Sequence, residues 1–290
     1  MTAIYRREMR SIFCGWIGWS VLAVWLLLGG WFSMRYNVLK TTSEFSYLFQ
    51  DLSVYMIAVM PILAAYSITR DQRNGTTLWL RSLPVGSVQL ILGKYLAAVT
   101  VFAIPTVFYG LYPIFLNNYG SVSYGSAYTA LAGYFLLGAA WLAVCFFVAS
   151  RFRRIWLAIL VMLVMGAVTY FLILLATVFA ILPLICLLVC LSGCIAAGIV
   201  VGIRSHRALR GILIGGVPAV LLTVCYFLYR NLFSDWIPKL LNFVSLFSRY
   251  SGFCSGYFDV SAAVLYLSVI FLAGFFTVTY PMSSFQKGGK

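Results

Sequence analysis

Three cysteines spaced four residues apart come closest in this chain to a pattern with reactive chemistry. On a helix, Cys186, Cys190 and Cys194 would share one face. A soft-metal site needs thiolates, and forming three of them in an apolar segment without basic or histidine neighbours is costly. We interpret the three as small residues on a packing face, and we expect no metal and no cofactor.

Other catalytic patterns fail for equally simple reasons. The single histidine, His206, stands among arginines with no carboxylate or nucleophile near it in sequence. Gly93 and Lys94 are followed by Tyr95, and no glycine stands five residues before Gly93, so they are not a Walker A motif. We expect a protein that is not an enzyme and that draws any energy for transport from another polypeptide.

Long segments without charged residues predict the helices of this chain. Eight segments lack Asp, Glu, Lys, Arg and His, and each is about as long as a helix crossing a ~30 Å hydrocarbon layer. The chain is 63% hydrophobic and 9% charged. We predict an all-α, polytopic helical membrane protein of about eight transmembrane helices, with residues 1–290 forming a single transmembrane domain. The predicted spans are Gly15–Met34, Leu52–Ile68, Leu96–Leu116, Ala127–Ala149, Ile155–Leu174, Leu184–Ile203, Ile212–Tyr229 and Val260–Tyr280.

The placement of the basic residues predicts the orientation. With eight spans, fifteen of the 20 Lys and Arg residues fall on the side of the two termini, which is typical of the cytoplasmic side. A seven-span count would put one basic cluster outside. The apolar run from Ile155 to Ile203 has only Pro183 to divide it, so its division is open. The net charge of +14 follows this topology, and we expect no nucleic acid as a partner.

Three segments outside the spans have patterns of their own. Residues 1–14 place apolar and arginine side chains on opposite faces, which predicts a short helix in the cytoplasmic interface. Residues 69–94 form a basic cytoplasmic loop with room for a short amphipathic helix ending at Pro84. Residues 231–257 predict one or two amphipathic helices at the outer leaflet. From physical arguments alone, residues 69–94 could equally be an ordinary interfacial loop, and residues 231–257 could equally be an interfacial anchor.

Several short motifs, taken in order along the chain, resemble the ABC-2 type permeases, and most closely their gliding-motility-type branch. They include Asp51-Leu52-Ser53, Pro61-Ile62-Leu63, Arg73-x-Gly75-Thr76, Ser82-Leu83-Pro84-Val85, Leu92-Gly93-Lys94-Tyr95-Leu96, Gly133-Tyr134-Phe135-Leu136-Leu137-Gly138 and Ser245-Leu246-Phe247-Ser248-Arg249-Tyr250. The resemblance implies the ABC-2 (type V exporter) fold. It also implies a membrane subunit of an exporter in the plasma membrane of a bacterium.

The resemblance further implies partners and residue roles. Two permease subunits, identical or different, would each rest on an ABC ATPase subunit in the lipid bilayer, with room for an accessory membrane protein. The loop between spans two and three would be a coupling helix seated on the ATPase, and the segment before the last span would be re-entrant or interfacial. Coupling roles fall on Arg73, Gly75, Thr76, Leu78, Leu83, Pro84, Gly93 and Lys94, and outer roles on Trp236, Pro238, Phe247, Arg249 and Asp259.

Two other function classes are alternatives to an exporter. A non-transporting scaffold of an envelope or motility machinery would keep its function when a partner ATPase is inactivated. An ion-coupled carrier would need carboxylates or histidines at membrane depth, and the predicted spans contain neither. The sequence does not identify the substrate.

Overall fold

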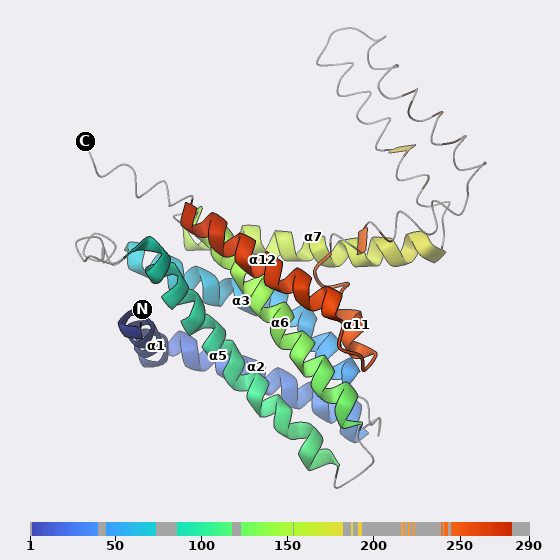
Figure 1. Ribbon diagram of the computed structural model, residues 1–290, viewed down its shortest axis with the longest axis horizontal. Helices are drawn as coiled ribbons and strands as arrows, with labels where there is room; N and C mark the ends of the chain where they lie inside the picture. The colour runs from blue at the N-terminus through green and yellow to red at the C-terminus, as the bar shows by residue number, and fades with distance from the viewer. Residues whose placement is uncertain are drawn as a thin grey trace. The chain divides into compact units, whose positions relative to one another are not determined.

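The computed structural model describes residues 2–39, 45–73, 86–117, 123–152, 154–181 and 245–279, with a few isolated positions between residues 187 and 242. These residues are helical almost throughout and contain no strand, which confirms the all-α prediction (Figure 1). In lipid, backbone groups find no other partners, so uncharged apolar segments satisfy them within helices.

Six helices of the described residues are long and apolar enough to cross a membrane, and each coincides with a predicted span. They are α2 (Trp16–Ser33, continued by the π-helix η1, Met34–Leu39), α3 (Ser46–Arg73), α5 (Ser87–Leu116), α6 (Tyr124–Ala149), α7 (Ile155–Ile181) and α12 (Val260–Thr279). Two shorter helices are α1 (Thr2–Cys14) and α11 (Tyr250–Cys254). The predicted spans Leu184–Ile203 and Ile212–Tyr229 fall almost entirely outside the described residues, so the count of eight stays a prediction.

The chain divides into two compact units. The first comprises Met1–Ala167 and Arg249–Lys290, and it contains the bundle described below. The second comprises Val168–Ser248, where the Ser245 hydroxyl donates a hydrogen bond to the Thr169 carbonyl at 3.1 Å. That the whole chain forms a single transmembrane domain stays a prediction.

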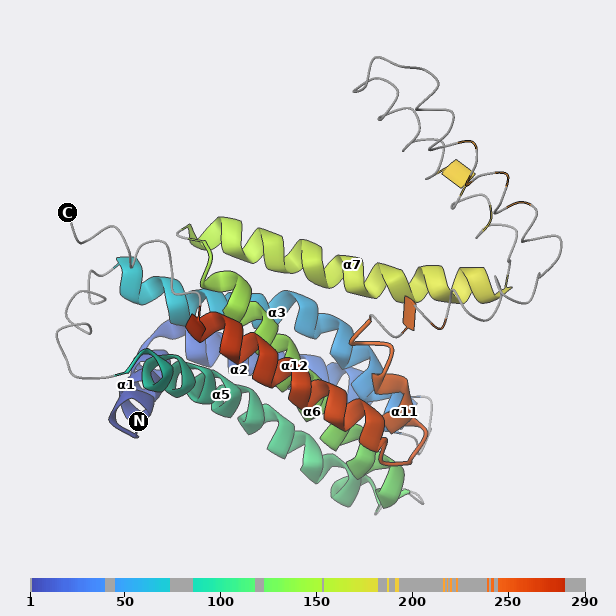
Figure 2. The same cartoon turned by 45° about the horizontal axis from the view of Figure 1, so that its top comes forward.

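Helix α6 is the centre of the first unit. It packs against α3 and α12 most extensively, and also against α5 and α11, as Figure 2 shows. Tyr134 of α6 is fully buried, with its ring 5.5 Å from those of Phe49 on α3 and Phe102 on α5. Trp25 of α2 meets the same ring at 6.3 Å. Because lipid is as apolar as these side chains, close packing of this kind holds membrane helices together.

Two helices begin earlier than the charge-free segments predict. Helix α3 takes in Asp51 near its start, and α5 takes in Lys94 in its second turn. Each charge has a polar partner on another element: Tyr36 donates to Asp51, and Lys94 donates to the carbonyl of Ser67. A partnered charge near the end of a span costs much less than an isolated one, so the helix continues past it.

Candidate functional site

The N-terminal helix α1 is fixed along the start of α5. Gly93 provides the close approach, because a Cβ atom there would lie 2.9 Å from Cγ2 of Ile4. Two turns further along α5, the Tyr5 hydroxyl donates to Oγ1 of Thr100 at 3.1 Å. The helix predicted for residues 1–14 is therefore present and docks on a membrane span; its place in the cytoplasmic interface stays a prediction.

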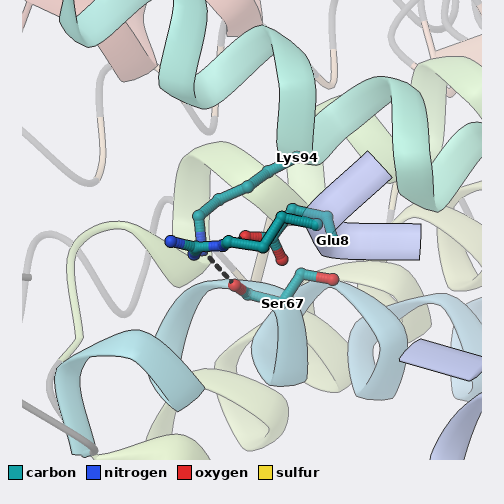
Figure 3. Close-up of polar contacts among 4 residues, drawn as sticks. Glu8, Ser67 and Lys94 are labelled. Atoms are coloured by element: carbon teal, nitrogen blue, oxygen red, sulfur yellow. Dashed lines mark hydrogen bonds and ion pairs between the residues drawn. The ribbon is translucent and has the colours of Figure 1, made fainter. Parts of the chain in front are cut away.

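A buried ion pair joins α1 to α5, and a hydrogen bond joins α5 to α3 (Figure 3). Lys94 Nζ lies 3.7 Å from Oε1 of Glu8 and donates to the Ser67 carbonyl at 2.7 Å. Arg7 Nη2 donates to the same Glu8 oxygen at 2.8 Å. We call Arg7, Glu8, Ser67 and Lys94 the three-helix network, since α1, α3 and α5 each contribute to it.

Because Glu8 and Lys94 are buried, removing either charge from the three-helix network should lower the stability of the bundle. Glu8 and Lys94 are each only 5% exposed, whereas the Arg7 side chain is 41% exposed. Removing one partner of a buried ion pair leaves an uncompensated charge away from water, which typically costs about 3–5 kcal/mol. The two buried charges therefore hold three helices in one arrangement, and the network has no nucleophile or metal ligand set for chemistry.

The network lies close to both ends of the segment between α3 and α5. Ser67 precedes the end of α3 at Arg73 by six residues, and Lys94 follows the start of α5 at Ser87 by seven. At ~1.5 Å per residue, each attachment point is about 10 Å along its helix from the connecting segment. A displacement of that segment would thus reach α1, α3 and α5 together.

The coupling residues predicted from the resemblance divide into two groups. Arg73 is the last residue of α3, and Gly93 and Lys94 are among the contacts just described. Gly75, Thr76, Leu78, Leu83 and Pro84 lie outside the described residues. Their coupling roles, and those of Arg73, Gly93 and Lys94, stay predictions.

At the opposite end of the bundle, α11 is packed into the first unit. Phe253 is fully buried against Gly133 of α6, where a Cβ atom would lie 2.4 Å from the phenyl ring. The Tyr250 hydroxyl donates to the Ala130 carbonyl at 3.1 Å, and Ser46 of α3 donates to the Cys254 carbonyl at 2.8 Å. Burial raises the pKa of Tyr250 well above its ordinary value, so its hydroxyl stays a donor.

Three of the five outer residues predicted from the resemblance lie among the described residues. Asp259 caps α12, since its Oδ1 accepts from the backbone N–H groups of Ser261 and Ala262 at 3.0 and 3.2 Å. Arg249 is the residue before α11, and Phe247 is a buried residue that belongs to the second unit. Trp236 and Pro238 lie outside the described residues. A role of these five in shaping a transport path stays a prediction.

Sequence reasoning did not find Glu8 and Ser67. Glu8 stands among arginines, so its adjacent Arg7 is the obvious partner, and only the docking of α1 on α5 brings Lys94 to it. Ser67 takes part through its backbone carbonyl, which no side-chain pattern can indicate. The solitary acidic residue in an otherwise basic N-terminal helix was the one available signal.

A comparison with protein-family models matches residues 39–207 to the model described as ABC-2 family transporter protein, which is more than half of the chain. The chain belongs to the ABC-2 transporter family. It is thus a membrane permease component of an ABC transporter. In this family the permease component is not the catalytic one, and it associates with an ABC ATPase subunit. Comparisons with curated proteins and with solved structures give no match. Membership of the gliding-motility-type branch stays a prediction for this permease.

Proposed function

We propose that this permease is the membrane subunit of an ABC-2 exporter in a bacterial plasma membrane. Two permease subunits, identical or related, would lie side by side, and ATP hydrolysed by the partner ATPase would drive an as yet unidentified substrate outward. Membership of the ABC-2 family supports a membrane subunit of an ABC transporter. The observation that carries the coupling mechanism is the three-helix network beside both ends of the segment 74–85.

In this mechanism the segment 74–85 contacts the ATPase and receives its movement. Because Lys94 bonds to Ser67 and lies beside Glu8, α3 and α5 cannot follow that movement independently. The three helices would instead shift as one body, and packed helices switch between discrete arrangements rather than deforming continuously. Arg73 would transmit motion from the end of α3, and the close approach at Gly93 would keep α1 in step with α5.

The orientation proposed here puts α1 and the network at the cytoplasmic face. The excess of Lys and Arg on the side of the termini supports it. Two exposed positions at opposite ends test it in a cysteine-free background: Arg151→Cys and Tyr257→Cys. An impermeant maleimide added to intact cells should label only the variant at 257, and the variant at 151 only after permeabilisation. The reverse pattern would overturn the orientation.

Coupling is tested with the cassette ATPase that co-purifies with the permease. In proteoliposomes, Leu83→Asp and Pro84→Ala should lower transport-coupled ATP hydrolysis severalfold while the permease stays folded. A matched control is Val88→Ala, an exposed position at the start of α5. The proposal fails if no cassette ATPase binds, if the variants at 83 and 84 behave like the control, or if the permease alone drives uphill flux.

A further inference from the structure

The membrane-crossing part of α3, Ser46–Ile68, contains one carboxylate. It is Asp51, near the start of α3. Its position is sixteen residues from Ser67, which places it about 24 Å along α3 from the three-helix network. Ionisable residues inside spans are rare even when they have a partner, and they commonly mark functional sites.

Aromatic rings surround Asp51 from two elements. Tyr47 and Tyr55 lie four residues to either side of it on α3, so the three side chains share one helix face. From η1, the Tyr36 hydroxyl donates to Oδ2 of Asp51 at 2.6 Å. The Tyr36 ring stacks on Tyr47 at 6.2 Å. We call Phe32, Arg35, Tyr36, Tyr47, Asp51 and Tyr55 the Asp51 cluster.

The Asp51 cluster remains open beside the carboxylate. Tyr47 is 49% exposed and Tyr55 is 41% exposed, although Phe32 beneath Tyr55 is buried, with the two rings 5.5 Å apart. The described residues offer a hydrogen bond to Oδ2 of Asp51 and none to its Oδ1. An acceptor oxygen and two partly exposed tyrosine rings thus lie on the same helix face.

This combination favours a cation. Aromatic faces attract ammonium groups, and a neighbouring carboxylate adds the opposite charge. The cluster already shows this chemistry internally, because the Arg35 guanidinium lies 5.8 Å from the centre of the Tyr36 ring. The cluster is also built partly on η1, and π-helical turns occur frequently at functional sites.

We propose that the Asp51 cluster binds the organic ammonium group of an amphiphilic cargo. The inference rests on the proposed function, which makes this end of the bundle the outer one and the bound cation a substrate on its way out. Tyrosines at span ends commonly form an interfacial belt with no ligand. A belt explains the exposed rings, but it does not explain a carboxylate hydrogen-bonded between them.

The test measures binding of tetrapropylammonium chloride to the full chain in uncharged maltoside micelles by titration calorimetry, at constant ionic strength. We expect saturable binding that Asp51→Asn weakens about tenfold, since the amide can still accept from Tyr36 but carries no charge. Asp259→Asn is the control, because it removes the same charge near α12 and keeps a residue suited to capping.

A second pair keeps the test decisive if the variant at 51 does not fold. Tyr55→Leu removes a ring and should weaken binding severalfold, whereas Tyr55→Phe keeps the ring and should restore it. The proposal is overturned if the parent shows no saturable binding, if the variants at 51 and 259 bind alike, or if Leu and Phe at 55 bind alike. Because no ATPase is present, such a failure would leave the proposed coupling mechanism standing.

Discussion

The three-helix network gives a prediction whose size follows from its geometry. Glu8→Gln and Lys94→Gln are made singly and together, and the free energy of unfolding is measured for each. At 3.7 Å and an effective dielectric constant of about 20, the attraction between Glu8 and Lys94 is about 4 kcal/mol before desolvation. Glu8→Gln should cost about 3 kcal/mol, because it removes the carboxylate beside a buried ammonium.

The two single changes should differ in size. Lys94→Gln should cost less than Glu8→Gln, because Glu8 keeps its contact with Arg7 at 2.8 Å. The double variant should recover part of the loss, giving a coupling energy of about 2 kcal/mol. Each value is obtained by titrating the purified chain in maltoside micelles with sodium dodecyl sulfate and following tryptophan fluorescence.

Arg6 provides the control for charge alone. It is exposed on the same helix α1, and Arg6→Gln should change stability by less than about 0.5 kcal/mol. A coupling energy below about 0.5 kcal/mol would refute the reasoning, because it would mean that Glu8 and Lys94 do not sense each other. A cost at Arg6 equal to that at Lys94 would refute it too, since the effect would then come from net charge.

Three further predictions use the same purified chain. Gly93→Leu should lower the free energy of unfolding by about 1–3 kcal/mol, because the new side chain would clash with Ile4. Gly86→Leu is the control, since the structure leaves open space there, and equal costs at the two positions would contradict the close approach at Gly93. Asp259→Ala should cost about 1 kcal/mol in the same titration and Asp259→Asn much less, unless the cap does not form. In a variant that keeps only Cys254 of the seven cysteines, this thiol should react with maleimide more slowly than exposed Cys14 does in a variant that keeps only Cys14, because burial raises the pKa of Cys254. The rate at Cys254 should rise with pH, and equal rates at the two positions would contradict the effect of burial.

The sequence predicted the helices through a strong physical constraint. An uncharged apolar segment of about 20 residues has few alternatives to a membrane-crossing helix, and the six such helices of the described residues lie where expected. The boundaries at Asp51 and Lys94 were less predictable. Whether a helix continues through a charge depends on a partner from another helix, which here is Tyr36 for the first and Ser67 for the second.

The candidate site was predictable only in part, for the same reason. The resemblance pointed to Gly93 and Lys94 as positions of interest, and the structure shows what they contact. Glu8 could not be assigned, because its partner depends on the angle at which α1 meets α5. The docking places Ile4 against Gly93, a close fit that no periodic pattern in the sequence indicates.

The docking of α1 has a consequence for the order in which the chain is assembled. Glu8 leaves the ribosome before any span, but Lys94 follows only after α2 and α3 have been made. During synthesis Glu8 is therefore made before Lys94, while its neighbour Arg7 is already present. Helix α1 can dock only once α5 has been inserted, so the contact between Glu8 and Lys94 forms after the first three spans are in place.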